Sequence, residues 1–214
     1  MLIDCLKTLN IEKDITLRFF INDKPKHGYE QNCFYYCIDD DKKRDCLIPD
    51  FAFESWAEAG INHFIETTEE IEQRGKQKWK DHRLGWIGNT KTNKIREKLM
   101  ILSKEMPDSF DFNDTFVDDF IIHKKQVPYL SLPDHTKYKY LLDVEGNSYS
   151  ARLKFLFFSQ RVIFLQDRSW KEYFHYDLVP YKHFIPIKND LSDLHDQYQK
   201  IEKDPELYEQ IAQN

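Results

Sequence analysis

The chain has 214 residues, 41% of them hydrophobic and 15% aromatic, so it can bury one substantial core or two small ones. Its formal net charge of −6 at pH 7 argues against a general binder of nucleic acid or another polyanion. Positive charge is instead concentrated locally, because residues 74–104 hold ten Lys or Arg and only two acidic side chains. Such a local excess fits a small phosphorylated ligand.

Targeting and cysteine patterns suggest a reducing compartment. The first residues lack the basic and apolar regions of a secretory leader, and no apolar stretch approaches the roughly 18 residues of a membrane span. The four cysteines, Cys5, Cys33, Cys37 and Cys46, include no Cys-x-x-Cys pair and have no partner His at zinc spacing. We therefore expect a cytoplasmic protein with reduced thiols.

The first half of the chain reads as short elements separated by charged loops. Residues 2–9 have helical spacing, and residues 15–21 form a β-branched and aromatic strand that Pro25 ends. The remaining expected elements of this half are extended segments over 32–37 and 46–53, a helix over 67–80 capped by Thr67 or Thr68, a buried strand over 84–88, a helix over 94–105, and an irregular acidic stretch over 106–119.

From residue 138 onward, predicted strands and helices alternate regularly. The strands cover 138–144, 162–166 and 183–187, and the helices cover 151–160, 169–175 and 190–202. Strands separated by helices pair in parallel through right-handed crossovers. The sequence therefore predicts an α/β protein with a doubly wound, Rossmann-type parallel sheet and flanking helices.

Two loops of similar design each follow a predicted strand and open a predicted helix. One runs from Gly88 to Arg96 and the other from Gly146 to Arg152, so each places an arginine in or near the first turn of its helix. We expect Gly146 and Asn147 to adopt left-handed backbone in the second turn. Loops of this kind lie at the carboxyl ends of the strands, where ligands bind.

Arg96 and Arg152 could then hold one diphosphate from two sides, aided by free amides and the positive end of each helix. The alternative is that both are surface cations on ordinary helices. Neither loop is a dinucleotide or nucleoside-triphosphate fingerprint, because the chain has no Gly-x-Gly-x-x-Gly and no Gly-Lys-Ser/Thr.

A longer pattern links these loops to other parts of the chain. It consists of Asn22-Asp23-Lys24-Pro25, Ile48-Pro49-Asp50-Phe51-Ala52-Phe53, Trp86-Ile87-Gly88, Tyr138-Lys-Tyr-Leu-Leu-Asp143, Ser150-Ala-Arg152-Leu-Lys154, Glu172-Tyr-Phe174 and His183-Phe-Ile-Pro186-Ile-Lys188. In this order the motifs resemble those of glycosyltransferase family 90. That family contains lipopolysaccharide core and capsule glycosyltransferases as well as eukaryotic protein O-glucosyl- and O-xylosyltransferases.

The resemblance implies a GT-B-like architecture of two Rossmann-like lobes. Residues 1–78 would form a partial amino-terminal lobe that carries the catalytic base, and residues 79–214 the lobe that binds the nucleotide-sugar donor. The resemblance also implies transfer with inversion, without a bound metal and with no cofactor besides the donor substrate, which we expect to be a UDP-sugar. The implied donor-binding residues are Gly88, Asn89, Arg96, Asn147, Ser148, Tyr149, Ser150, Ala151 and Arg152.

Asp23 falls where the family has its catalytic base, in an Asp-x-Pro turn after a strand. Sugar transfer needs a carboxylate to take the proton of the acceptor hydroxyl. From the residues alone, an Asx-type turn before Pro25 is the favoured interpretation of Asp23, and only the resemblance reverses that preference. The run Asp39-Asp40-Asp41 invites a metal interpretation, but its place in a charged loop favours a solvated turn.

Three functions fit these observations. The first is a cytoplasmic enzyme that moves a sugar to a lipopolysaccharide or capsular glycan, with peripheral contact to the inner face of the membrane through a lipid-linked acceptor. The second is a protein O-glycosyltransferase. The third is a truncated, non-catalytic relative that binds a nucleotide.

Overall fold

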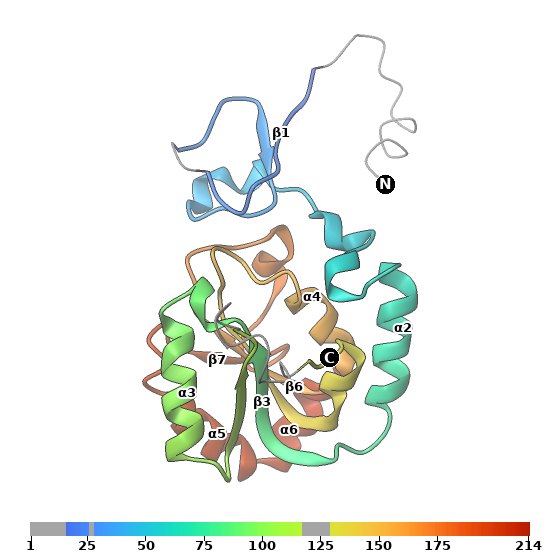
Figure 1. The fold of residues 1–214 in the computed structure, drawn as a ribbon, viewed down its shortest axis with the longest axis vertical. Coiled ribbons are helices and arrows are strands. Elements are labelled where there is room, and N and C mark those ends of the chain that lie inside the picture. The colour runs from blue at the N-terminus through green and yellow to red at the C-terminus, as the bar shows by residue number, and fades with distance from the viewer. Residues whose placement is uncertain (1–15, 26–27, 117–128) are drawn as a thin grey trace, which may run out of the picture.

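The structure is a computed structural model that describes residues 16–25, 28–116 and 129–214. Its centre is a five-stranded sheet in the order β4-β3-β5-β6-β7 (Figure 1). The strands are β3 (Asp81–Gly88), β4 (Phe110–Asp114), β5 (Tyr138–Asp143), β6 (Val162–Gln166) and β7 (Ile185–Ile187). All neighbouring pairs are parallel. The predicted α/β class with a Rossmann-like parallel sheet is therefore confirmed.

Helices cover both faces of the sheet. On one face, α3 (Ile95–Glu105), α5 (Leu194–Glu202) and α6 (Pro205–Gln213) pack on alternate strand residues such as Tyr140 and Phe164. On the other face, Leu141 and Ile163 pack against α4 (Leu153–Leu156) and the 3-10 turn that continues it. The helix α2 (Phe64–Gly75) lies outside α4 and contacts Phe155 through its own apolar residues.

The strand order reverses direction next to β3. The chain passes from β3 through α3 to the edge strand β4, and then crosses to β5 on the other side of β3. At such a switch point the loops that leave two adjacent strands diverge and open a crevice at the carboxyl edge of the sheet. Here the two loops are those that follow Gly88 and Asp143.

The described part of the amino-terminal segment lies beyond this carboxyl edge (Figure 1). It contains a parallel pair, β1 (Arg18–Phe20) and β2 (Cys33–Tyr35), followed by 3-10 turns at 41–46, 51–53 and 57–59. Ile38 exchanges two backbone hydrogen bonds with Lys171, at 3.0 and 2.8 Å, and so ties the segment to the sheet domain. The division of the chain at residue 78 stays a prediction, and the expected helix over 2–9 lies outside the described residues.

Several helix predictions are corrected by the structure. The helix expected over 67–80 is α2 and begins at Phe64. It ends at Gly75, where the backbone lies so close to Ser159 that a Cβ would be 2.3 Å from its backbone oxygen. The helix expected over 151–160 is only the single turn α4 plus a 3-10 turn, and the one expected over 169–175 is a 3-10 helix at Tyr173–Asp177.

Two elements were missed. The stretch over 106–119 that was expected to be irregular contains β4. Acidic side chains are tolerated in β4 because it is an edge strand, and Asp111 accepts a hydrogen bond from Tyr138 at 2.6 Å. The helix α6 was also missed, although Asp204 and Pro205 are a typical helix start. None of the helices in the described ranges is long and apolar enough to cross a membrane.

Candidate functional site

A cavity of about 460 Å³ lies at the switch point of the sheet, between the amino-terminal segment and the two strand-end loops. It is lined by Asp23, Phe51, Trp56, Asn89, Thr92, Arg96, Thr115 and residues 146–152. The structure thus brings together all the predicted site residues except Gly88. Gly88 ends β3 and leaves room for Trp86, because a Cβ at Gly88 would lie 2.8 Å from its ring.

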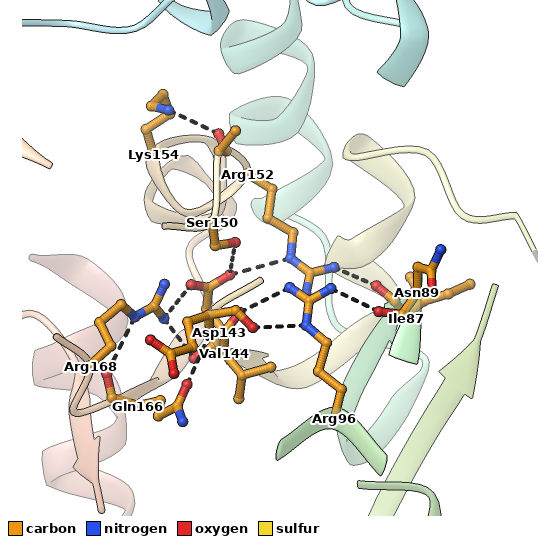
Figure 2. A network of polar contacts seen from close by, with 12 residues as sticks. Ile87, Asn89, Arg96, Asp143, Val144, Ser150, Arg152, Lys154, Gln166 and Arg168 are labelled. Carbon is orange, nitrogen blue, oxygen red and sulfur yellow. Dashed lines mark hydrogen bonds and ion pairs between the residues drawn. The ribbon is translucent and has the colours of Figure 1, made fainter. Parts of the chain in front are cut away.

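Arg96 joins the two loops. It lies in the first turn of α3, as predicted, and its guanidinium reaches back beneath the cavity (Figure 2). Its Nε, Nη1 and Nη2 donate to the carbonyl oxygens of Glu145, Asn89 and Val144 at 2.9, 3.1 and 3.2 Å. A guanidinium has five N–H donors, so two remain for a ligand.

Arg152 approaches from the opposite side, and the two guanidinium groups lie next to each other (Figure 2). Its Nε donates to Asp143 at 3.3 Å and its Nη1 to the Ile87 carbonyl, while the buried Nη2 has no partner among the described residues. Both guanidinium carbons lie over the Trp86 ring, 5.4 and 5.6 Å from its centroid. Arg96 is buried and the Arg152 side chain is 13% exposed, so both lie beside one cavity rather than exposed on separate helix faces.

The carboxylate of Asp143, at the end of β5, organises this cluster and was not singled out from the sequence. It is fully buried and accepts hydrogen bonds from Ser150 and Arg168 at 2.6 Å each. Burial alone would raise the pKa of Asp143, but the positive charges of Arg168 and Arg152 outweigh it and hold that pKa below its usual value. The sequence signal that could have indicated this role is the position of Asp143 at the end of the predicted strand, just before the loop that leads to Arg152.

Positive charge exceeds what Asp143 can balance. Burial and the neighbouring charge of Arg152 lower the pKa of Arg96 to about 9. Burial also lowers the pKa of Arg152, against the opposing effect of Asp143. A depressed arginine pKa means that the environment disfavours the cation, so a bound anion would relieve the excess.

The loop from Gly146 to Ala151 differs from the prediction in its backbone. Neither Gly146 nor Asn147 has a positive φ. The glycine at 146 instead leaves space for Arg96, because a Cβ there would lie 3.2 Å from Arg96 Nη2 and press on the guanidinium. Since α4 has only four residues, its dipole is small, and the arginines are the main source of positive potential here.

The side chains of the loop are largely engaged with the protein. Ser150 donates to Asp143, and the Ser148 hydroxyl and the Tyr149 backbone lie against the Cys37 thiol. Burial, with the nearby charge of Asp50, raises the pKa of Tyr149. Asn89 caps the turn after β3 through a 2.8 Å hydrogen bond from the Lys91 amide. These residues shape the cavity, and their contacts with a donor stay a prediction.

Asp23 lies on the amino-terminal side of the same cavity and is exposed. Its Oδ2 accepts a hydrogen bond from Asn147 at 3.1 Å, and its backbone carbonyl accepts one from the Cys37 thiol at 3.0 Å. The carboxylate therefore faces the loop that carries Arg152, and a substrate in the cavity can reach it.

A second buried ionic cluster supports the cavity and was also missed. Lys154 Nζ, on α4, lies 2.9 Å from Asp50 and 2.8 Å from Glu172, and all three side chains are at most 3% exposed. Burial, with Asp50 adding to it, raises the pKa of Glu172 to about 8, although Lys154 opposes this. The three residues link the amino-terminal segment, α4 and the segment after β6.

Within the described ranges, His, Cys, Asp and Glu side chains form no group of three that could hold a metal ion. The acidic run at 39–41 is used in other contacts. Asp39 accepts from Tyr29, Asp40 from the Lys42 amide, and Asp41 from both Lys171 and Tyr176.

Comparisons with known proteins identify the family of the chain. The model of glycosyl transferase family 90 matches residues 8–214, so the chain belongs to that family, as predicted, and its class is that of the glycosyltransferases.

Among characterised relatives, the chain is 29% identical over 187 residues to the O-glucosyltransferase rumi of Drosophila pseudoobscura pseudoobscura, covering 79% of this chain and 45% of the relative. It is 30% identical over 138 residues to protein O-glucosyltransferase 1 of Rattus norvegicus, covering 62% of this chain and 35% of the relative. The human protein O-glucosyltransferase 1 is 29% identical over 139 residues, with 63% of this chain and 36% of the relative covered. The chain thus spans less than half the length of these relatives.

Proposed function

We propose that the chain transfers a sugar, with inversion and without a metal, from a UDP-sugar held at the switch-point cavity to an acceptor hydroxyl. The observation that carries the proposal is the pair Arg96 and Arg152, which lie side by side, largely removed from solvent, with an excess of positive charge. A departing diphosphate develops negative charge at the transition state. Preorganised cations that meet this charge are a large source of rate enhancement in such sites.

The two arginines act as a unit because the protein itself fixes their orientation. Arg96 is held by three backbone carbonyls and Arg152 by Asp143 and Ile87, so neither must be ordered when a ligand binds. Their unused N–H groups are the donors available to the phosphate oxygens. Each charge-assisted hydrogen bond of this type contributes roughly 1.5–3 kcal/mol.

Asp23 is the proposed general base. It lies on the amino-terminal side of the cavity, whereas the arginines lie at the carboxyl edge of the sheet. Its carboxylate accepts a hydrogen bond from Asn147, in the loop that leads to Arg152. In an inverting displacement the acceptor oxygen attacks the anomeric carbon as the diphosphate leaves, and Asp23 takes the acceptor proton. A positioned carboxylate in this role typically contributes about 10²- to 10⁴-fold in rate.

The test is to titrate the chain with UDP by calorimetry and then to measure hydrolysis or transfer with a panel of UDP-sugars. Binding of UDP, together with loss of transfer but not of binding in Asp23→Asn, is the expected result. Binding of UDP without turnover on any sugar would support the non-catalytic alternative. Lack of UDP binding would refute the proposal.

For the acceptor we propose a lipopolysaccharide or capsular glycan, which carries with it a cytoplasmic location and contact with the inner face of the membrane through the acceptor lipid. The name protein O-glucosyltransferase 1, which two of these relatives carry, supports a second candidate, a protein acceptor, equally well. Transfer to lipid-linked oligosaccharide but not to a secreted protein domain would decide for the glycan, and the reverse result would decide for the protein.

A further inference from the structure

Another cavity, of about 290 Å³, lies at the amino edge of the sheet, opposite to the switch-point cavity. It is formed by the connection from α2 to β3, which lies toward the bottom of Figure 1, and by the residues just before β5. Its lining residues are Arg74, Gln77, Lys78, Lys80, Asp134, Thr136 and Lys137. None of them lines the switch-point cavity, so the two cavities are separate.

This cavity at the amino edge is strongly positive. Four cations line it against one carboxylate, that of Asp134, and Arg74 already forms an ion pair with this carboxylate. The other three cations are Lys78, Lys80 and Lys137. Within the described ranges, none of these three lysines forms an ion pair with a carboxylate. The cavity therefore has an excess of positive charge that the protein leaves unbalanced.

The same residues account for part of the basic excess that the sequence shows over residues 74–104. Of the ten Lys and Arg in that stretch, only Arg96 lines the switch-point cavity. Arg74, Lys78 and Lys80 line the cavity at the opposite edge of the sheet. The diphosphate site thus explains only a part of this positive charge.

The backbone holds the two lining segments together before any ligand binds. The Lys80 amide donates to the Lys137 carbonyl at 2.8 Å, so these residues are neighbours where β3 and β5 begin. The buried Arg161 guanidinium donates to the carbonyls of Gln77 and Thr136, at 2.6 and 3.1 Å. Like charges held side by side repel each other, and an anion placed between them removes this cost.

We infer that this cavity binds the phosphate group of a small molecule other than the sugar donor. Lysine ammonium groups are common partners of phosphate, and a phosphate dianion offers oxygens to several of them at once. A cleft lined by charge of one sign also concentrates ions of the opposite sign. A carboxylate carries one negative charge and would leave more of the excess unbalanced. Because the cavity lies at the opposite edge of the sheet from Arg96 and Arg152, its ligand takes no part in the transfer step.

The surroundings of the cavity favour a compact ligand over a long polyanion or a membrane surface. Glu70 and Glu72 lie on α2, which ends at the cavity. Glu209, on α6, lines an adjoining cavity that shares Gln77 and Lys78 with this one. Acidic side chains thus flank the lysines and confine the positive potential. The volume of about 290 Å³ is close to the lower end of small-molecule sites, roughly 300 Å³.

The experiment titrates the chain with inorganic pyrophosphate by calorimetry, in an Arg152→Met background that weakens the diphosphate site. Lys80→Gln combined with Lys137→Gln removes two ammonium groups from the cavity and should raise the dissociation constant at least about 10-fold. Lys42→Gln combined with Lys43→Gln is the matched control, because it changes the net charge equally in an exposed turn of the amino-terminal segment. This control should stay within twofold of its parent. Urea unfolding checks that each variant keeps its fold.

Equal affinities in the two double variants would overturn the inference, as would the absence of pyrophosphate binding at millimolar concentration. Binding to phosphatidylglycerol vesicles that depends on Lys80 and Lys137, without binding of pyrophosphate, would assign the surface to a membrane and overturn it too. In the wild-type background the same double variant should bind UDP within twofold, and a larger loss would place the donor phosphates here and overturn the inference. Lack of UDP binding by the wild-type chain would refute the proposed function alone, because the two cavities share no lining residue.

Discussion

Replacing Arg152 with methionine tests the diphosphate site most directly, because the change removes the charge and keeps much of the side-chain volume. The variant loses the N–H donors that face the cavity, of which Nη2 has no partner in the described residues. The loss of one charge-assisted hydrogen bond to phosphate corresponds to roughly 1.5–3 kcal/mol. We therefore expect the dissociation constant for UDP to rise by about 10- to 150-fold.

The cost in stability should be smaller. The Arg152 Nε lies 3.3 Å from Asp143, which is long for a charge-assisted hydrogen bond, and Asp143 keeps Arg168 and Ser150 at 2.6 Å. We expect Arg152→Met to lower the free energy of unfolding by roughly 1–3 kcal/mol. Urea unfolding and calorimetric titration of the same preparation measure the two effects separately.

Arg161→Met is the matched control. Arg161 is as buried as Arg96, but its guanidinium donates only to backbone carbonyls, those of Thr136, Gly75, Gln160 and Gln77. This variant should lose at least as much stability, because it leaves neutral buried acceptors without a donor, and yet bind UDP normally. If Arg152→Met binds UDP within twofold of the wild type, or if both variants lose affinity alike, the reasoning about the arginine pair is wrong.

Three further predictions follow from the same geometry. Asp23→Asn should lower transfer at least 100-fold and leave UDP affinity unchanged. The control Asp39→Asn, which affects an exposed contact with Tyr29, should change neither transfer nor affinity. Transfer near the wild-type rate in Asp23→Asn would show that Asp23 is not the base. Turnover measured after treatment with EDTA should equal that of the untreated protein, and a requirement for added manganese would contradict the metal-free mechanism. Glu172→Gln should reduce the loss of stability between pH 5 and pH 8: burial raises the pKa of Glu172 to about 8, so the folded chain keeps a proton that the unfolded chain releases, and stability falls as pH rises through this window. Unfolding free energies at the two pH values check this, and identical slopes in variant and wild type would refute it.

The sequence was sufficient to predict the parallel sheet because its buried strands are strongly marked. The stretches that became β5 and β6 are almost continuous runs of apolar residues, as expected for strands covered on both faces. The regular spacing of helices between them then fixed the parallel pairing. In contrast, β4 alternates Phe with Asp and Asn, a pattern that is stable only because Asp111 and Asp114 find partners in Tyr138 and Thr90. Those partners lie far away in sequence.

The site was predictable in its members but not in its internal contacts. Arg96 and Arg152 could be paired because each follows a strand end, and parallel strand ends share one edge of the sheet. Their common support could not be predicted, since Arg96 is held by carbonyls of the loop after β5 and Arg152 by a carbonyl of β3. The short α4 was mistaken for a full helix because residues 151–160 have helical composition. The turn ends where Gln160 adopts a positive φ of 53° and the chain enters β6.

The buried cluster of Asp50, Lys154 and Glu172 explains how the proposed base and the loop from Gly146 to Ala151 keep their positions. Burying Asp50, Lys154 and Glu172 together adds little net stability, so the value of the cluster lies in the fixed geometry that it imposes. Lys154 lies one turn after the loop that carries Arg152, and Asp50 caps the turn that places Phe51 in the cavity. Asp23 is joined to the same region through Asn147 and Cys37. Because these contacts come from both sides of the cavity, a shift of the amino-terminal segment would take Asp50 away from the buried Lys154 at the same time as it separates Asp23 from the arginines. The cluster therefore couples the fold of the segment to the geometry of the site.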